Sequence, residues 1–207
     1  MLTPTTTMST TTAVPILPAI ADRWSPRSYA ATPVSDEDLT GLLEAARWAP
    51  SCFGAEPWRF VIGVAGRGEG HAAIASTLMD ANRAWAAKAP ILMVALAREA
   101  FEFNDQPNAW AAHDVGLAMG QLGVEATARG LVVHQMGGFD AEQAKELLGV
   151  PDGYRAISAI AVGHPGPPEN LPGGPDGELA ERERAPRSRK PLSEVAFEGT
   201  FGASYAG

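Results

Sequence analysis

The sequence predicts one α+β domain, and two observations support this. Hydrophobic residues make up 45% of the 207 residues, which is enough apolar material for one sizeable core. Candidate strands and helices follow one another without a regular βαβ alternation, so a doubly wound parallel sheet is not expected. No internal repeat is visible. We therefore expect residues 19–207 to form a single domain in which helices flank one sheet.

Composition excludes several partners. The formal net charge of -8 repels nucleic acid and anionic membrane surfaces, so we expect neither. Cys52 is the single cysteine, so no intrachain disulfide can form, and this fits a reducing compartment. The longest apolar run, residues 90–97, is far too short to span a bilayer. We expect a cytoplasmic protein.

The first residues differ in composition from the rest. The stretch MLTPTTTMSTTTAV is rich in threonine and lacks the basic start of a signal peptide. We expect residues 1–18 to form a disordered arm.

Residues 35–50 predict a helix. Ser35 is a candidate N-cap with Asp38 three residues on, and Pro50 ends the run. The apolar positions at helical spacing are Leu39, Leu42, Leu43 and Ala46.

Two apolar runs, residues 58–65 and 90–97, are typical of buried strands. Between them, residues 70–89 predict one helix. Its apolar face would carry Ile74, Leu78, Ala81 and Trp85.

Residues 108–130 predict the longest helix, which carries Gly116, Gly120 and Gly123 on one face. Each glycine inside a helix costs about 1 kcal/mol relative to alanine, so we expect another backbone to approach this face closely. The approaching backbone belongs either to the same subunit or to a second subunit across a dimer interface.

The last third of the chain predicts two strands and a helix. Residues 131–136 and 154–164 are the strand candidates. Asp140 and Gln143 resemble a capping box that opens a helix over 141–150. Residues 165–177 predict an irregular loop because proline and glycine dominate them.

Residues 63–70 suggest a glycine-rich phosphate cradle between a strand and a helix. The spacing does not contain G-x-G-x-x-G, and no acidic residue follows at the distance that a ribose contact needs. A flexible surface turn explains these glycines at least as well.

The remaining reactive side chains predict neither a metal site nor a nucleophile. The four histidines, at 71, 113, 134 and 164, show no metal-ligand spacing, and we expect structural or surface roles. His113 could line a pocket, but its side chain should point away from that of Asp114, its neighbour on a helix. Cys52 has no evident partner base and is more typical of a small buried residue.

Two basic clusters lie at opposite ends of the chain. Arg23 and Arg27 flank Ser25 near the start, and Arg187 and Arg189 precede Lys190 near the end. If they converge, they would make a compact anion site suited to phosphate. The spacing of these residues is equally compatible with two independent clusters of charged side chains that are exposed to solvent.

Four segments together resemble the nitroreductase family of flavin mononucleotide (FMN) enzymes. They are residues 23–29, 42–60, 134–140 and 187–199, in the family's order and spacing. The combination of R-x-S-x-R with A-P-S-x(5)-P-W is the specific part. The resemblance extends from Ile20 to Gly202.

The resemblance implies an intertwined α+β homodimer, with a mixed or antiparallel central sheet and two FMN sites at the subunit interface. It also implies ping-pong hydride transfer from NAD(P)H through flavin N5 to nitroaromatics, quinones or similar electron-poor acceptors. The glycine-bearing helix then matches the family's central interface helix. Other reactions on this fold remain alternatives: dehydrogenation in natural-product biosynthesis, dehalogenation and flavin breakdown. A flavin-binding protein without catalysis is a further alternative.

The resemblance implies FMN contacts from both ends and the middle of the chain, and no protein group need act as a catalytic acid or base. Pro50, Ser51 and Cys52 match a segment that reaches the flavin from the other subunit. The full set of implied contacts is Arg23, Trp24, Ser25, Arg27, Pro50, Ser51, Cys52, Phe53, Gly54, Glu56, Asn82, Gly137, Gly138, Arg187 and Arg189.

The chain departs from the family pattern S-x-x-N-x-Q-P-W at two positions. Gly54 replaces the asparagine and Glu56 the glutamine. A lost amide hydrogen bond costs about 0.5–1.5 kcal/mol, whereas each charge-assisted phosphate contact contributes about 1.5–3 kcal/mol, so FMN binding should survive. Near the ring, Glu56 would lower the flavin potential. Alternatively it faces solvent or an arginine and leaves the ring unaffected.

Overall fold

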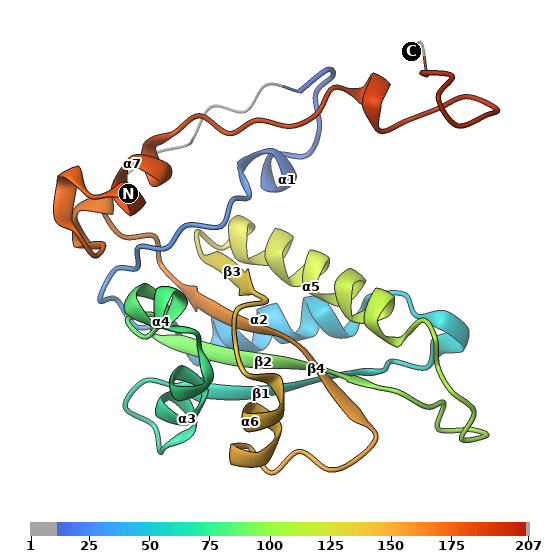
Figure 1. The fold of residues 1–207 in the computed structure, drawn as a ribbon, viewed down its shortest axis with the longest axis horizontal. Coiled ribbons are helices and arrows are strands. Elements are labelled where there is room, and N and C mark those ends of the chain that lie inside the picture. The colour runs from blue at the N-terminus through green and yellow to red at the C-terminus, as the bar shows by residue number, and fades with distance from the viewer. Residues whose placement is uncertain (1–11, 206–207) are drawn as a thin grey trace.

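The computed structural model describes residues 12–205, and its centre is a four-stranded antiparallel sheet (Figure 1). The strands lie in the order β1-β2-β4-β3. Their bounds are Trp58–Val64 for β1, Ile91–Arg98 for β2, Val132–Met136 for β3 and Tyr154–Gly163 for β4. All three pairings are antiparallel, which confirms the α+β class. The hypothesis that residues 63–70 form a dinucleotide-binding loop is wrong, because it required a parallel βαβ unit.

The two central strands are the most buried. Every residue of β2 from Ile91 to Ala97 is buried, and β4 is buried from Ser158 to Gly163. The expectation of a fully buried strand fails for β1, where only Trp58 and Gly63 are buried. β1 lies at an edge of the sheet, so solvent reaches several of its side chains.

Helices cover both faces of the sheet (Figure 1). α2 (Asp36–Arg47) and α5 (Ala111–Ala128) pack on one face, where Leu42 and Leu122 are fully buried. α3 (Gly70–Thr77), α4 (Asp80–Ala86) and α6 (Ala141–Leu147) cover the other face. Each fully buried side chain of leucine size contributes about 1.5–3 kcal/mol, so the two layers together stabilise the sheet.

The single helix expected over residues 70–89 is in fact two helices, α3 and α4. At the break, Met79 N–H donates to Gly138 O at 3.1 Å, and Asp140 N–H donates to Thr77 O at 2.8 Å. These contacts with a distant segment replace helical hydrogen bonds and turn the chain. As a result, Ile74 and Trp85 are buried as expected, whereas Ala81 is exposed.

Both predicted helix caps are present. Ser35 Oγ accepts the N–H of Asp38 at 3.0 Å at the start of α2. Asp140 accepts the N–H of Gln143 at 2.9 Å at the start of α6. These bonds satisfy N–H groups that have no partner within the helix.

Two short helices were not expected from the sequence. α1 (Pro18–Asp22) begins at the last residue of the expected arm, and residues 12–17 form neither helix nor strand. Residues 1–11 of that arm lie outside the described residues. α7 (Glu178–Arg184) follows the predicted loop, which contains two short 3-10 turns at Pro168–Asn170 and Gly174–Asp176. Two further 3-10 turns lie at Cys52–Gly54 and Leu192–Glu194.

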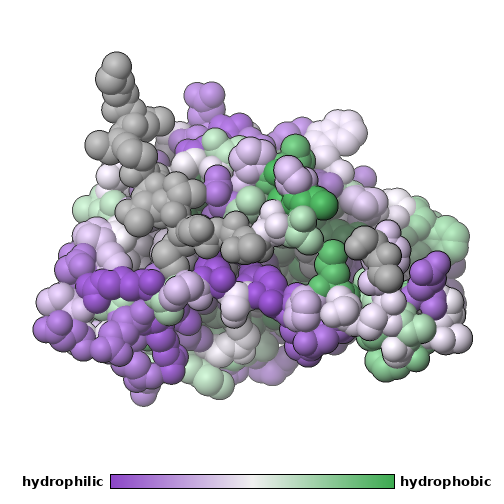
Figure 2. All heavy atoms as spheres, turned by 90° about the horizontal axis from the view of Figure 1, so that it is seen from above, coloured by the Kyte–Doolittle hydropathy of each residue, from purple (hydrophilic) through white to green (hydrophobic). Residues whose placement is uncertain are grey.

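The two ends of the chain run together over α5 (Figure 1). Large apolar side chains on both ends face solvent, among them Val14, Leu17, Val195 and Phe201, the last of which is 94% exposed. Figure 2 views this side, where hydrophobic and hydrophilic residues are interspersed. Within residues 12–205, none of the helices has the length and apolar character needed to cross a membrane.

Candidate functional site

Three arginines from both ends of the chain line one cavity of about 770 Å³. Arg23 follows α1, whereas Arg187 and Arg189 follow α7. Residues of the two basic clusters therefore lie together, as the hypothesis of a phosphate site required. The other described residues that line this cavity are Thr12, Ala13, Val14, Ile16, Ile20, Ala21, Ser188, Lys190, Pro191 and Leu192.

Backbone hydrogen bonds hold this cluster together. The Arg187 guanidinium donates to Arg23 O at 2.8 Å and to Ala21 O at 2.9 Å, so it fastens one end of the chain to the other. Burial, and then the charges of Arg189 and Arg187, lower the pKa of Arg23 below its usual value. Three cations that repel one another around a cavity form a site that an anion would stabilise.

Arg27, the second arginine of R-x-S-x-R, lies in different surroundings. Its backbone N–H and its Nη1 donate to Glu183 Oε1 at 2.9 and 3.4 Å. Its guanidinium lies 5.9 Å from the centre of the Trp85 ring. Within the motif, Ser25 accepts a hydrogen bond from Arg23 at 3.3 Å, and Trp24 is partly buried.

Asn82 and the glycine pair are brought together by the turn after β3. Asn82 Nδ2 donates to Gly138 O at 3.0 Å. A Cβ at Gly138 would lie only 2.6 Å from Asn82 Nδ2, so a larger residue there would displace the Asn82 side chain. A Cβ at Gly137 would meet no described atom within 4 Å. This turn therefore offers an open backbone surface beside a fixed amide side chain.

Trp85 connects this turn to Arg27. It lies one helical turn after Asn82 on α4, so the two side chains share a face. Its ring packs 4.6 Å from the ring of His134, whose Nδ1 donates to Pro26 O at 3.0 Å. Burial lowers the pKa of His134. The structural role expected for His134 matches these contacts.

The candidate residues of the loop 50–56 are anchored at the other end of α5. Cys52 N–H donates to Asp114 Oδ2 at 2.9 Å, and His113 Nδ1 lies 3.1 Å from Asp114 Oδ1. The expectation that His113 and Asp114 point apart is wrong, because the imidazole folds back onto the carboxylate in the first turn of α5. Cys52 is partly buried rather than fully buried.

This loop has an unusual backbone. Phe53, Gly54 and Glu56 have φ angles of 53°, 64° and 44°. Left-handed backbone costs a residue with a side chain about 1–2 kcal/mol, and glycine avoids that cost. Gly54 therefore suits its conformation. Phe53 as a whole residue is 82% exposed, and its ring lies edge-on to Phe101 and Phe103.

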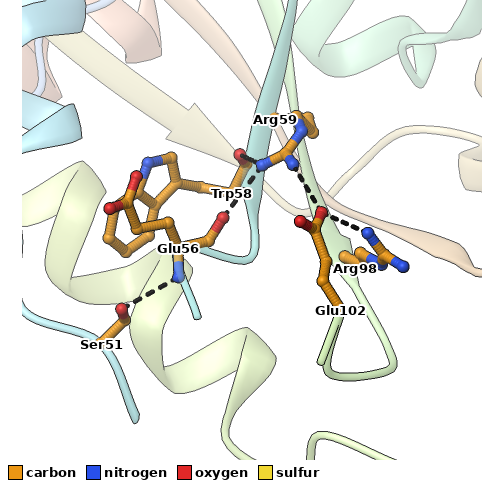
Figure 3. Close-up of polar contacts among 6 residues, drawn as sticks. All are labelled: Ser51, Glu56, Trp58, Arg59, Arg98 and Glu102. Carbon is orange, nitrogen blue, oxygen red and sulfur yellow. Dashed lines mark hydrogen bonds and ion pairs between the residues drawn. The ribbon is translucent and has the colours of Figure 1, made fainter. Parts of the chain in front are cut away.

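Glu56 is exposed, and its backbone makes the contacts shown in Figure 3. Its N–H donates to Ser51 Oγ at 3.0 Å, and its carbonyl accepts from Arg59 at 2.9 Å. The Glu56 carboxylate points away from Arg59 in Figure 3. Its charge helps Glu44 to raise the pKa of Arg47. Within one chain, the Glu56 side chain is therefore exposed and close enough to Arg47 to act on its pKa.

Within a single chain, the loop 50–56 lies away from the cluster formed by Arg23, Arg187 and Arg189. Arg23 Cδ lies 3.6 Å from the position of a Cβ on Gly123, near the end of α5, whereas Asp114 anchors the loop in its first turn. At 1.5 Å per residue, these two points are about 14 Å apart along the helix. The candidate contacts therefore form two separate groups on each chain.

The three glycines of α5 do not share one environment. Gly116 and Gly120 are exposed, and a Cβ on either would meet nothing within 4 Å among the described residues. Gly123 is buried next to Arg23. Even at Gly123 the nearest atom, Arg23 Cδ, would lie at an ordinary contact distance from a Cβ, so tight packing within the subunit does not account for these glycines.

Sequence reasoning missed Glu183 and Trp85. The helical spacing of Trp85 from Asn82 could have indicated Trp85, but no local signal pairs Glu183 with Arg27, which is 156 residues away. Within the described part of the chain, no three His, Cys, Asp or Glu side chains gather to hold a metal ion.

Comparisons with known proteins agree with this geometry. The sequence model of the nitroreductase family matches residues 20–83 and 65–164. A solved oxidoreductase containing FMN is 34% identical, with a TM-score of 0.86 over 96% of this chain and 98% of its own.

Two further matches carry related names. A Desulfovibrio desulfuricans protein, assigned as a nitroreductase and solved in complex with FMN, is 26% identical, with a TM-score of 0.69 over 92% of this chain and 99% of its own. A Streptomyces coelicolor protein assigned as an NADH dehydrogenase/NAD(P)H nitroreductase is 28% identical in an alignment 187 residues long, which covers 78% of this chain and 92% of the relative. The matched family model and the antiparallel fold together establish that this chain belongs to the nitroreductase family.

Proposed function

We propose that this protein is an FMN-dependent oxidoreductase. It takes hydride from NAD(P)H and delivers it to a nitroaromatic, a quinone or a similar electron-poor acceptor, in a ping-pong sequence. The observation that carries the proposal is the meeting of Arg23, Arg187 and Arg189 around one cavity of about 770 Å³. The FMN present in two similar solved structures supports the choice of cofactor.

The arginine cluster fits the phosphate of FMN. Guanidinium groups bind phosphate through paired hydrogen bonds, each worth about 1.5–3 kcal/mol when charge-assisted. The lowered pKa of Arg23 arises in part from Arg189 and Arg187, and a phosphate would offset that repulsion. An acidic protein that concentrates three cations at one place is selective for an anion there.

The turn at Gly137 and Gly138 fits the edge of a flat ring. The open surface at Gly137 lets a planar group approach the backbone, and the Asn82 side chain is fixed beside it. FMN, when bound, would supply the hydride chemistry, so these residues need only bind it, orient it and exclude water.

We propose further that the working unit is a homodimer in which each site takes residues from two chains. The loop 50–56 lies about 14 Å along α5 from the arginine cluster of its own chain, so it would complete the site of the other subunit. The exposed apolar side chains at both chain ends, and the open face at Gly116 and Gly120, are surfaces that a second copy would cover.

An absorbance spectrum of the purified protein tests the proposal. Bound FMN should give a yellow protein, and NADH or NADPH added without oxygen should bleach it. Oxidised FMN should then return when a quinone is added. The proposal fails if the protein is colourless and monomeric and remains so after soaking in excess FMN. A yellow protein that neither dinucleotide bleaches would instead indicate a flavin-binding protein without this activity.

A further inference from the structure

Glu183 of α7 is a buried carboxylate with a single cationic partner among the described residues. Its side chain is 2% exposed, and Oε1 accepts the backbone N–H and the Nη1 of Arg27 at 2.9 and 3.4 Å. Burying two charges is costly unless they are paired and hydrogen-bonded. The contact therefore fixes the backbone position of the R-x-S-x-R segment. Burial raises the pKa of Glu183, and the N–H and the charge of Arg27 oppose that shift.

The Arg27–Glu183 pair lies toward the Gly137–Gly138 turn rather than in the arginine cluster. The Arg27 guanidinium is 5.9 Å from the centre of the Trp85 ring, and Trp85 shares a face of α4 with Asn82, which binds Gly138 O. The charges that lower the pKa of Arg23 come from Arg189 and Arg187, whereas Arg27 acts on His134 beside Trp85. The proposed site thus has one end where the positive charges of three arginines lie together. At its other end, Glu183 neutralises the charge of Arg27.

We propose that Glu183 is a positioning residue that holds Arg27 against Trp85 and cancels its charge at the ring end of the FMN site. This inference rests on the proposed function. An unpaired Arg27 would attract the extra negative charge of reduced FMN, and the adjacent carboxylate removes that attraction. Glu183 therefore sets the affinity for reduced FMN relative to oxidised FMN, and so lowers the flavin midpoint potential.

The test compares Glu183→Gln with Glu181→Gln, which changes an exposed glutamate on the same helix. Glutamine keeps an oxygen that accepts the Arg27 N–H and removes the negative charge. We expect Glu183→Gln to raise the midpoint potential by about 30 mV, which equals a tenfold gain in binding of reduced over oxidised FMN for a two-electron couple. Glu181→Gln should leave the potential unchanged.

A second variant tests whether Glu183 acts through Arg27. Arg27→Gln leaves Glu183 without its partner, and burial raises the pKa of Glu183, so the potential is measured from pH 7 to 9. It should fall below that of the wild type at the same pH once Glu183 ionises. This variant also provides the test if Glu183→Gln does not fold. In the double variant Arg27→Gln/Glu183→Gln, the negative charge is absent at every pH, so the potential should lie above that of Arg27→Gln alone at the upper end of this pH range.

Two outcomes overturn the inference in distinguishable ways. If the wild type binds FMN but Glu183→Gln has the wild-type potential in a folded protein, only the role of Glu183 fails. A potential in Arg27→Gln that equals the wild-type potential at every pH from 7 to 9 has the same meaning. If the wild type does not bind FMN at all, the proposed function and the role of Glu183 fail together. Thermal unfolding of each FMN-free variant confirms that the protein compared is folded.

Discussion

The carboxylate of Asp114 accepts the backbone N–H of Cys52 at 2.9 Å and thereby ties the loop 50–56 to the first turn of α5. The Asp114 side chain is only 3% exposed, and its second oxygen faces His113 Nδ1 at 3.1 Å. One buried residue of the central helix therefore positions the loop that would complete the site of the other subunit.

Asp114→Ala should lower the free energy of unfolding by about 1–3 kcal/mol, because it removes a charge-assisted hydrogen bond to the partly buried N–H of Cys52. Asp114→Asn keeps one oxygen for that N–H and should cost less. Urea unfolding of the FMN-free proteins measures both changes. Equal losses in the two variants would contradict this account, because they would show that the acceptor oxygen is not what matters.

Arg189→Ala should weaken FMN binding by about 10- to 150-fold, which corresponds to one charge-assisted phosphate contact. Riboflavin, which lacks the phosphate, should bind both proteins equally. Fluorescence quenching of each ligand gives the two affinities. Arg182→Ala is the matched control, because Arg182 is an exposed arginine of α7 whose partner is Glu178. A parallel loss of riboflavin affinity would place Arg189 away from the phosphate.

The sequence predicts the elements whose signals are local. Ser35 caps α2 and Asp140 caps α6 as expected, because a cap depends on residues three positions apart. The apolar runs over residues 58–65 and 90–97 become β1 and β2, because a run of adjacent apolar residues is also a local signal. The break between α3 and α4 escapes prediction, because it depends on hydrogen bonds to residues 138–140, far along the chain.

The residues of the candidate site also fall into those that local motifs predict and those whose positions depend on distant parts of the chain. The R-x-S-x-R motif and the basic pair at Arg187 and Arg189 are visible in the sequence, and the structure brings Arg23 to the second of them. The separate position of Arg27 is not visible, because it is set by the distant Glu183 and by Trp85. Tertiary partners of this kind leave no periodic or spaced pattern in a single sequence.

Gly138→Ala should lower the stability of the protein, whereas Gly137→Ala should lower its affinity for FMN. A Cβ at Gly138 would lie 2.6 Å from Asn82 Nδ2, so Gly138→Ala should break the Asn82 hydrogen bond and cost about 1 kcal/mol of stability. A Cβ at Gly137 meets only open space, so the FMN-free Gly137→Ala protein should be as stable as the wild type. Its FMN affinity should nevertheless fall, because the methyl group would occupy the surface offered to the ring. Unchanged affinity in Gly137→Ala would show that the ring does not pack there.

Acid should destabilise the protein through His134. Burial against Trp85 lowers the pKa of His134, so the folded state holds its proton less tightly than the unfolded chain, where the pKa is about 6.5. The resulting stability is fully present above pH 6.5 and is lost as the pH falls through the lower pKa of the folded state. His134→Gln removes this titration while keeping an N–H that can donate to Pro26 O. Urea unfolding between pH 8 and 5 should therefore show a smaller loss of stability in His134→Gln than in the wild type, since both proteins share the same carboxylates. Identical pH slopes would mean that His134 is equally easy to protonate in the folded and unfolded chains, and that its burial among Trp85 and Pro26 does not disfavour the charged ring.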